Sequence, residues 1–391
     1  MAPAPSLAVL DPRAPAERRA IEEAWAALAA ADAGELGLFH EPAWFWPNLD
    51  YISPPEQRLR FALVEAAGTP LALIPFERRR WRRRKSRSPA VVGFLAPHLT
   101  GGDAALFLRR GHEAVAVGLF LRALGERAGP RLLSLDGLEV DGRCHRALAS
   151  ALATAPAAPE QLPPRGLQRV RLAADMHPYL ESRSRNHRRT LKRGSARLAQ
   201  LGEVRLEATL MATAEEFEPL ARLGRAGWRE ATTDDRRTAA AYRDYCVRLL
   251  VDGDPAWRHH RFLLRVGDDE AAGIYALASR DRIYGLQILY APKYAAASPG
   301  LVLLHGSILE LAREYPGGTY EFLGDNAYLH APATDAQVVC RDLFGLPTPG
   351  GRLTVAALTW LQQSKRGLAR VAAVRRRHAP LVPLRKSQRI P

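Results

Sequence analysis

One stretch in the second half of the chain, residues 282–325, has the pattern of a strand, a helix and a second strand. Its first part, 283–290, is rich in β-branched and aromatic residues, which favour a strand. The Ser-Pro-Gly run at 298–300 supplies an N-cap, a first-turn proline and a small residue, which predict the start of a helix. Such a unit forms a parallel crossover, and its helix starts at the carboxyl end of the first strand, where ligands usually bind.

Five further elements are predicted before this unit. Apolar and β-branched runs bounded by turn residues indicate strands over 203–207, 261–266 and 272–279, and the periodicity of 215–230 and 238–251 is typical of amphipathic helices. The predicted order of elements is therefore β, α, α, β, β, β, α, β.

That order, with a Ser-Pro-Gly run opening the main helix, resembles the GCN5-related N-acetyltransferase (GNAT) fold. The local sequence is similar to the branch called cellulose-biosynthesis-type or BioF2-like acetyltransferases, which is related to the Fem aminoacyl transferases. The residues that carry the resemblance are Tyr290, Pro292, Tyr294, Ser298, Pro299, Gly300, Tyr320, Phe322, Leu323, Gly324, Asp325 and Tyr328. The chain departs from the family pattern at Glu321, where an Asp is usual, and at Leu329, where a Lys is usual.

The first half of the chain repeats this organisation. The predicted strands cover 60–66, 71–77, 90–95 and 131–136, and the predicted helix covers 112–127. We therefore predict an α/β protein with a mixed sheet and two tandem GNAT-like acyltransferase domains, 1–160 and 167–391, joined by a linker rich in proline and alanine. The first domain lacks a Ser-Pro-Gly helix start, so we expect it to be structural or on the substrate side. The second is expected to hold the donor site.

The formal net charge of +15 is concentrated in three runs that contain no acidic residue, 78–87, 183–197 and 365–389. These runs hold 24 Lys and Arg residues, so the rest of the chain is net negative and the positive field is local. The first run surrounds Trp81 and combines cations with an aromatic ring, as a contact to nucleic acid or to an anionic membrane surface would. A solvated loop at a hairpin tip is the alternative.

The second basic run lies in a segment, 177–202, that predicts a helix with one packing face and a cationic remainder. Gly194 falls on the packing face, whereas Arg185, Arg188 and Arg189 fall on the cationic part. Planar guanidinium groups suit phosphate, so we predict that these arginines contact phosphate on the acyl donor or acceptor. The alternative is a solvated helix that bridges the two domains.

Three cysteines, Cys144, Cys246 and Cys340, lie far apart and form no CxxC pair, so we expect neither a disulfide framework nor a metal site. The pair His259-His260 has no ligand-like neighbours in the sequence and is expected at the surface. No run of about 18 apolar residues occurs, and the first residues lack the features of a signal peptide, so we expect a cytoplasmic protein.

The resemblance implies direct transfer of an acyl group from a thioester to an amine in a ternary complex, with acetyl-CoA or another acyl-CoA as the donor. It also implies that the backbone of Ile288, Leu289 and Tyr290 pairs with the pantetheine amides, much as a peptide adds to a sheet edge. Pyrophosphate is then expected at the helix start, over free backbone amides and the positive end of the helix dipole. The residues expected to hold it are Ser298, Gly300, Leu301 and Val302.

Two carboxylates beside this site, Glu321 and Asp325, are candidates for the base that takes a proton from the amine. A partly dry environment would raise the pKa of such a carboxylate towards neutrality, which suits a base. Tyr294 and Tyr328 are candidates for donating to the departing thiolate or for lining the acceptor pocket. The alternatives are that Glu321 pairs with an arginine and that both tyrosines pack in the core.

Three functions follow from these predictions. The first is an N-acyltransferase that moves an acyl group from acyl-CoA to a small-molecule amine or amino sugar, in envelope or polysaccharide biosynthesis. The second is a Fem-like transferase with aminoacyl-tRNA as its donor, and the third is a non-catalytic binding protein on the same fold. Clustered positive charge favours the second, whereas the Ser-Pro-Gly crossover favours the first. The basic helix also lacks the aromatic side chains that stack on unpaired bases, so tRNA is the less favoured partner.

Overall fold

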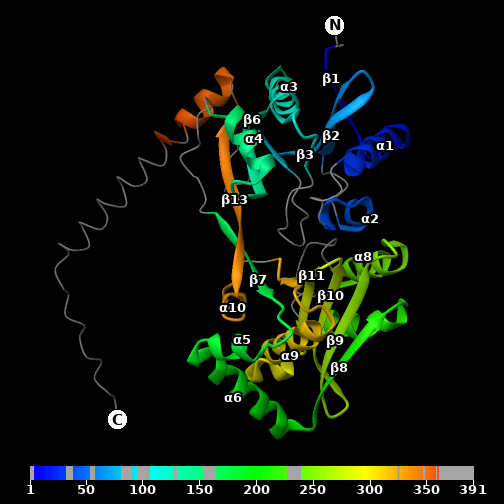
Figure 1. Ribbon diagram of the computed structural model, residues 1–391, viewed down its shortest axis with the longest axis vertical. Helices are drawn as coiled ribbons and strands as arrows, with labels where there is room; N and C mark the ends of the chain where they lie inside the picture. The colour runs from blue at the N-terminus through cyan, green and yellow to red at the C-terminus, as the bar shows by residue number, and fades with distance from the viewer. Residues whose placement is uncertain are drawn as a thin grey trace, which may run out of the picture.

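One mixed β-sheet runs through both halves of the chain in the computed structural model (Figure 1). The structure describes residues 4–31, 38–52, 58–80, 90–94, 106–126, 130–153, 164–226, 239–323, 326–346, 348–357 and 359–360. Within these residues, thirteen strands form the sheet in the order β1-β2-β3-β4-β6-β13-β7-β12-β11-β10-β9-β8, with β5 paired to β3 beside this path.

The strands of the N-terminal half are β1 (Ser6–Leu10), β2 (Arg58–Ala66), β3 (Thr69–Arg80), β4 (Ala90–Phe94), β5 (Phe107–Leu108) and β6 (Pro130–Glu139). The later strands are β7 (Arg165–Arg171), β8 (Val204–Met211), β9 (Arg258–Val266), β10 (Asp269–Ser279), β11 (Arg282–Tyr290), β12 (Thr319–Glu321) and β13 (Asp335–Gly345). The α-helices are α1 (Pro15–Ala31), α2 (Pro42–Pro47), α3 (Glu113–Glu126), α4 (Arg143–Ala151), α5 (His177–Ser182), α6 (Arg185–Leu201), α7 (Glu218–Ala226), α8 (Ala239–Asp252), α9 (Pro299–Glu314) and α10 (Ala327–His330).

The two halves share one order of elements. In the first half, β2, β3 and β4 form an antiparallel meander, and α3 then leads to β6, which is parallel to β4. In the second half, β9, β10 and β11 form the meander, and α9 leads to β12, which is parallel to β11. The predicted α/β fold with two tandem GNAT-like halves is therefore confirmed, as are the strands and helices predicted in both. The helix predicted over 215–230 is α7, and residues 227–238 lie outside the described part of the chain.

Two strands that the sequence did not predict join the halves. β7 follows the linker in sequence and pairs with β12, while β13 pairs with β7 at one end and with β6 at the other. Figure 1 shows β13 extending between the two halves, and its register shows that it begins beside β7 and ends beside β6. The buried side chains of Cys340 and Leu346 belong to the core of the N-terminal half. The sheet of the first half is thus completed by residues that follow 335, while the domain limits 1–160 and 167–391 stay a prediction.

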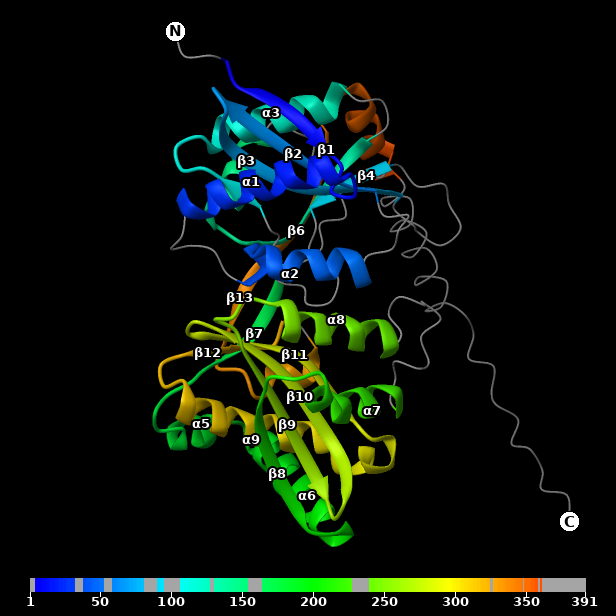
Figure 2. The same ribbon diagram turned by 90° about the vertical axis from the view of Figure 1, so that its right-hand side faces the viewer.

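A segment of the N-terminal half also packs against the C-terminal sheet. The 3-10 turn Leu38–His40 and helix α2 lie over α8 and over the sheet face opposite α9 (Figure 2). The ring of Phe39 meets that of Tyr284 edge-on, with 5.4 Å between their centroids. Trp44 meets Tyr245 in the same way at 5.8 Å. The face of the C-terminal sheet that carries Tyr284 is therefore covered by the other half.

The prediction of a surface pair at His259-His260 is wrong, because β9 lies inside the sheet and both rings are buried. His259 Nδ1 is 2.7 Å from the hydroxyl of Tyr275, and His260 Nε2 is 2.8 Å from that of Tyr315. Burial, helped by the neighbouring His260, lowers the pKa of His259 to about 4. The pair is structural and neutral at ordinary pH.

Helix α6 crosses the start of α9 at very short range. A Cβ atom built on Gly194 of α6 would lie 2.6 Å from the carbonyl oxygen of Ala297 and 3.1 Å from Val302 Cγ2. Arg197 of α6 donates to the carbonyl of Ala296 at 2.7 Å. The basic helix is therefore fixed beside the turn that precedes α9, and only glycine fits at the crossing.

We expect Gly194→Ala to lower the free energy of unfolding by about 1–3 kcal/mol, because the added methyl group forces α6 away from the backbone of Ala297. Gly118→Ala in α3 is the matched control, since its added Cβ meets no atom within 4 Å and alanine favours a helix. Chemical denaturation of both variants checks this prediction. Equal stability of the two variants would contradict the tight crossing.

Candidate active site

The parallel pairing of β11 and β12 is short. It joins residues 282–284 to 319–321 and then stops, so residues 285–290 of β11 have no strand beside them on that side in the described structure. This segment, which we call the unpaired edge, contains Ile288, Leu289 and Tyr290. Its backbone groups are the ones that can pair with an extended ligand. The structure thus places the three residues where a pantetheine chain was expected, and their role remains a prediction.

Helix α9 starts at the carboxyl end of this edge. Ser298 adopts the left-handed conformation, with φ 52° and ψ 51°, and its side chain makes no capping hydrogen bond. Instead its carbonyl oxygen accepts from the amides of Leu301, at 3.1 Å, and Val302, at 3.3 Å. The expectation of free amides at Leu301 and Val302 is therefore wrong, because the turn at Ser298 aims its carbonyl at them. The Gly300 N–H has no acceptor in the described structure.

Gly300 lies against the end of the unpaired edge. A Cβ built on it would be 3.4 Å from Ile288 Cγ2 and 3.9 Å from Tyr290 Cδ1. Tyr290 is 45% exposed, and Tyr328, which follows β12 on the short helix α10, is 54% exposed. Partial burial and the neighbouring Tyr290 raise the pKa of Tyr328, although a hydrogen bond with Asn326 opposes this. Two accessible phenol rings therefore lie near the start of α9.

Glu321 stands where the two parallel strands separate. It is the last residue of β12, and its register partner Tyr284 is the last paired residue of β11. Its side chain is buried, and Arg282 Nη1 lies 3.4 Å from Glu321 Oε1. Burial raises the pKa of Glu321, while Arg282 and Arg169 act in the opposite direction. The expected pairing with an arginine is present, yet burial keeps the carboxyl more basic than an exposed one.

The other predicted catalytic residues lie apart from this point. Tyr294 is buried in the core, and its hydroxyl donates to Asp269 Oδ2 at 2.9 Å, where Lys293 also pairs at 2.5 Å. This contact anchors the loop before α9 and engages the hydroxyl that was expected to face the substrate. Asp325 lies outside the described residues.

Helix α6 passes the start of α9 at Gly194, and its first two turns carry cationic side chains. Arg185, Arg188 and Arg189 are exposed, and the helix contains no acidic residue. The helix that carries them is fixed by the Ser184 cap at its start and by the Gly194 crossing described above. Together with the free amide of Gly300, they make this side of the C-terminal half suitable for phosphate.

The start of the equivalent helix in the first half, α3, carries a carboxylate of its own. Glu113 lies in the first turn of α3 and pairs with Arg143 at 3.2 Å. Burial opposes its ionisation, but hydrogen bonds from its own backbone and from Arg143 outweigh this and lower the pKa of Glu113. The first turn of α9 contains no acidic residue. Only the second half therefore leaves the start of its crossover helix open to an anion.

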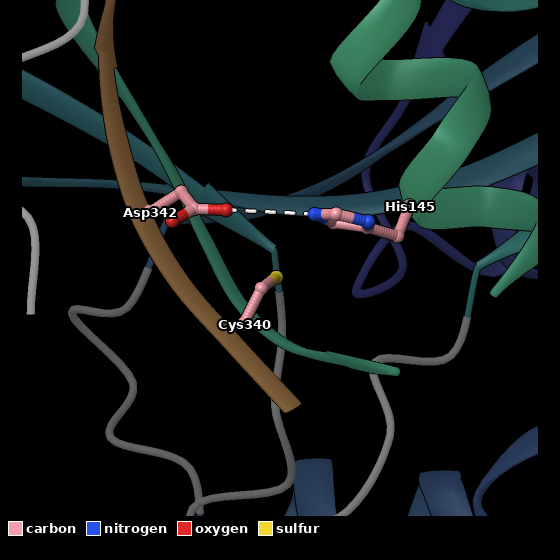
Figure 3. A group of neighbouring side chains, drawn as sticks. All are labelled: His145, Cys340 and Asp342. Carbon is pink, nitrogen blue, oxygen red and sulfur yellow. Dashed lines mark ion pairs between the residues drawn. The ribbon is translucent and has the colours of Figure 1, made fainter. Parts of the chain in front are cut away.

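A group of metal-binding residue types joins β13 to α4 (Figure 3). His145, Cys340 and Asp342 offer ligand atoms within 4.8 Å of one another, and His145 Nε2 lies 3.5 Å from Asp342 Oδ2. However, His145 Nδ1 accepts from the amide of Asp141 at 3.2 Å, which leaves the ring proton on Nε2, facing Asp342. Cys340 donates to the carbonyl of Leu135 at 3.6 Å. Hydrogen bonds account for this group, which fastens β13 to the first half.

Sequence reasoning missed the charged neighbours of Glu321. Arg169 and Asp335 stand on β7 and β13, two of the strands that were not predicted. Strand β7 is short and directly follows a linker rich in proline, and β13 contains only short apolar runs between charged residues, so neither was recognised. The sheet register alone brings these side chains to the site.

Residues 185–329 match the family model described as "Acetyltransferase (GNAT) domain". No curated protein is similar to the chain at a significant level. The crystal structure of FemX is similar to this chain with a TM-score of 0.50 and 12% identity, over 83% of this chain and 95% of that one.

Two further structures are similar at TM-scores below 0.5. A tandem GNAT protein from the clavulanic acid biosynthesis pathway gives 0.45 at 14% identity, over 88% of this chain and 97% of that one. The C-terminal domain of a putative lysylphosphatidylglycerol synthetase from Agrobacterium fabrum gives 0.47 at 12% identity, over 87% and 95%. At such identities a likeness concerns the fold alone. Residues 185–329 therefore carry a GNAT acetyltransferase domain.

Proposed function

We propose that the protein transfers an acyl group from acyl-CoA to the amine of a small molecule or amino sugar. The observation that carries this proposal is the position of Glu321, a buried carboxylate at the point where β11 and β12 separate. The unpaired edge leads from this point to the free amide of Gly300. A base and an anion site at the two ends of one open strand edge suit a donor that carries a thioester at one end and phosphates at the other.

The two substrates then approach from opposite faces of the sheet. The donor's phosphates lie at the start of α9 and its pantetheine chain follows the unpaired edge. Tyr284 and Glu321 are register partners, so their side chains share the face that is covered by Phe39 of the first half. The amine reaches the thioester from this face, where Glu321 takes its proton. The first half thus acts on the acceptor side. This agrees with the start of α3, where Glu113 takes the place of a bound anion.

The amine attacks the thioester carbonyl directly, and the thiolate leaves with its electron pair as the new amide forms. Backbone N–H groups on the unpaired edge are the donors available to the carbonyl oxygen. An acceptor from envelope or polysaccharide metabolism is what the family resemblance implies. The proposal includes a cytoplasmic location, where acyl-CoA is made. None of the described helices is long and apolar enough to cross a membrane.

A second candidate function uses aminoacyl-tRNA as the donor. The specific observation in its favour is the exposed cationic face of α6, a helix that passes the start of α9 at Gly194. Against it, no Phe, Tyr or Trp lies between residues 182 and 202, so the helix has no ring on which an unpaired base could stack.

The first prediction concerns donor binding. We expect Gly300→Asp to abolish the thermal shift produced by acetyl-CoA, because a carboxylate at the start of α9 repels the pyrophosphate. Gly300→Asn is the matched control, since it has the same size without the charge and its Cβ fits at ordinary contact distances. Equal shifts for both variants would place the phosphates elsewhere.

The second prediction concerns proton transfer. Glu321→Gln keeps the shape of the side chain and removes its basicity, so turnover should fall by about 10²–10⁴-fold while donor affinity is retained. Steady-state kinetics and calorimetric titration with acetyl-CoA check both halves of this statement. Activity within a few-fold of wild type at every pH would return Glu321 to a structural role.

The third prediction separates the two donors. If Arg185, Arg188, Arg189 and Lys192 meet the phosphates of coenzyme A, replacing them with Gln should raise the Michaelis constant for acetyl-CoA. If they follow an RNA backbone instead, wild-type binding of aminoacyl-tRNA should fall with salt on a log-log plot with a slope of about −3, and the substitutions should remove this dependence. A tight tRNA complex at about 150 mM salt would favour the second function.

A further inference from the structure

The charged neighbours of Glu321 form a row across four strands. Tyr284 of β11 is opposite Glu321 of β12, Glu321 is opposite Arg169 of β7, and Arg169 is opposite Asp335 of β13. Register partners on adjacent strands point to the same face, with Cβ atoms roughly 5 Å apart. An arginine therefore stands directly between two carboxylates, one on each side.

The arginine is held by only one of them. Arg169 Nε forms a very short ion pair with Asp335 Oδ1, and Arg171 Nε pairs with the other carboxylate oxygen at 2.8 Å. Partial burial opposes ionisation of Asp335, but the hydrogen bonds from Arg171 and Arg169 outweigh this and lower the pKa of its carboxyl. Asp335 is therefore charged at neutral pH and forms the ion pair with Arg169, whose charge acts on Glu321 without a direct pair in the described structure.

The only ion pair of Glu321 in the described structure is with Arg282, whose side chain is 47% exposed. Solvent partly screens this contact, which is still the largest of the effects that oppose the raised pKa of Glu321. Arg169 is 26% exposed and has the reach to form a second, better shielded pair with Glu321. The charged and titratable groups around Glu321 are Arg282 and Tyr284 on β11, Arg169 on β7, Glu139 on β6, Asp335 on β13 and Asp281 in the turn before β11.

We propose that Asp335 is a positioning residue that holds Arg169 away from Glu321 and so keeps Glu321 basic enough to accept a proton. This inference rests on the proposed function, in which Glu321 is the base. The inference gives β13 a second role. The start of this strand brings Asp335 to the C-terminal half, which holds the candidate site, and its end completes the sheet of the first half. The extension of β13 into both halves thus serves the chemistry as well as the fold.

The test is the pH dependence of turnover, measured as thiol release from acetyl-CoA with glucosamine as the amine probe. In Asp335→Asn the freed Arg169 pairs with Glu321, so the acid limb of the profile should move down by about one pH unit. In Arg169→Gln the limb should move up, because a cation beside Glu321 is lost. Arg171→Gln is the control: it also contacts Asp335, but its register partner is Thr319, so the limb should stay in place. If the pH profiles of all three variants coincide with that of the wild type while Glu321→Gln is inactive, the inference is overturned and the proposed function stands.

A second measurement does not depend on activity. The pKa of Glu321 is raised in the folded state. Above that pKa the carboxyl is ionised and lowers the stability of the fold, whereas below the pKa of the unfolded chain it is protonated and does not. Glu321→Gln should therefore raise the melting temperature relative to its parent at about pH 8 and not at about pH 4. In the Asp335→Asn background this gain should shrink, because Arg169 now stabilises the ionised carboxylate. If Glu321→Gln raises the melting temperature equally in both backgrounds, the inference is overturned. If the rise is smaller in Asp335→Asn but the wild type has no transferase activity, the inference is supported and the proposed function fails.

Discussion

The pairing of β11 with β12 ends after three residues, and the site depends on this early separation. Two parallel strands that paired along their full length would satisfy all of their backbone groups and leave nothing for a ligand. Here α9 is held on β11 by a buried apolar face, while β12 is drawn towards β7 by its antiparallel ladder. The strands therefore diverge, and Glu321 lies at the point of divergence with an open edge beyond it.

The two strands that join the halves explain how that divergence is maintained. β7 and β13 lie between the two halves, and each pairs with neighbours that are far away in the sequence. The hydrogen-bond ladder is continuous from β1 to β8, so the halves cannot move apart without breaking it. Leu38, Phe39 and Trp44 add an apolar contact from the first half to the core beneath Tyr284. Glu321 is consequently set in a rigid environment, as pre-organised catalysis would require of a base.

The two halves have the same order of elements but different electrostatics. At the start of α3 a carboxylate, Glu113, takes the place of an external anion and is paired with Arg143. At the start of α9 the first turn is apolar, the Gly300 amide is free, and the cationic helix α6 passes close by. One repeat has therefore closed its helix start with its own side chain, and the other has kept it open.

The sequence by itself determined the elements whose signals are local. The Ser-Pro-Gly run fixed the start of α9, and the β-branched run before it fixed β11, because the preference of proline for the first helical turn and strand propensity act within a few residues. Glu321 could be chosen as a candidate base for the same reason, since it follows that helix by a short, predictable connection. Only the tertiary structure decided that the carbonyl of Ser298 occupies the amides of Leu301 and Val302, and that Arg169 and Asp335 stand beside Glu321. Strand register and a left-handed turn depend on contacts between residues up to 166 positions apart, and no local pattern records such contacts.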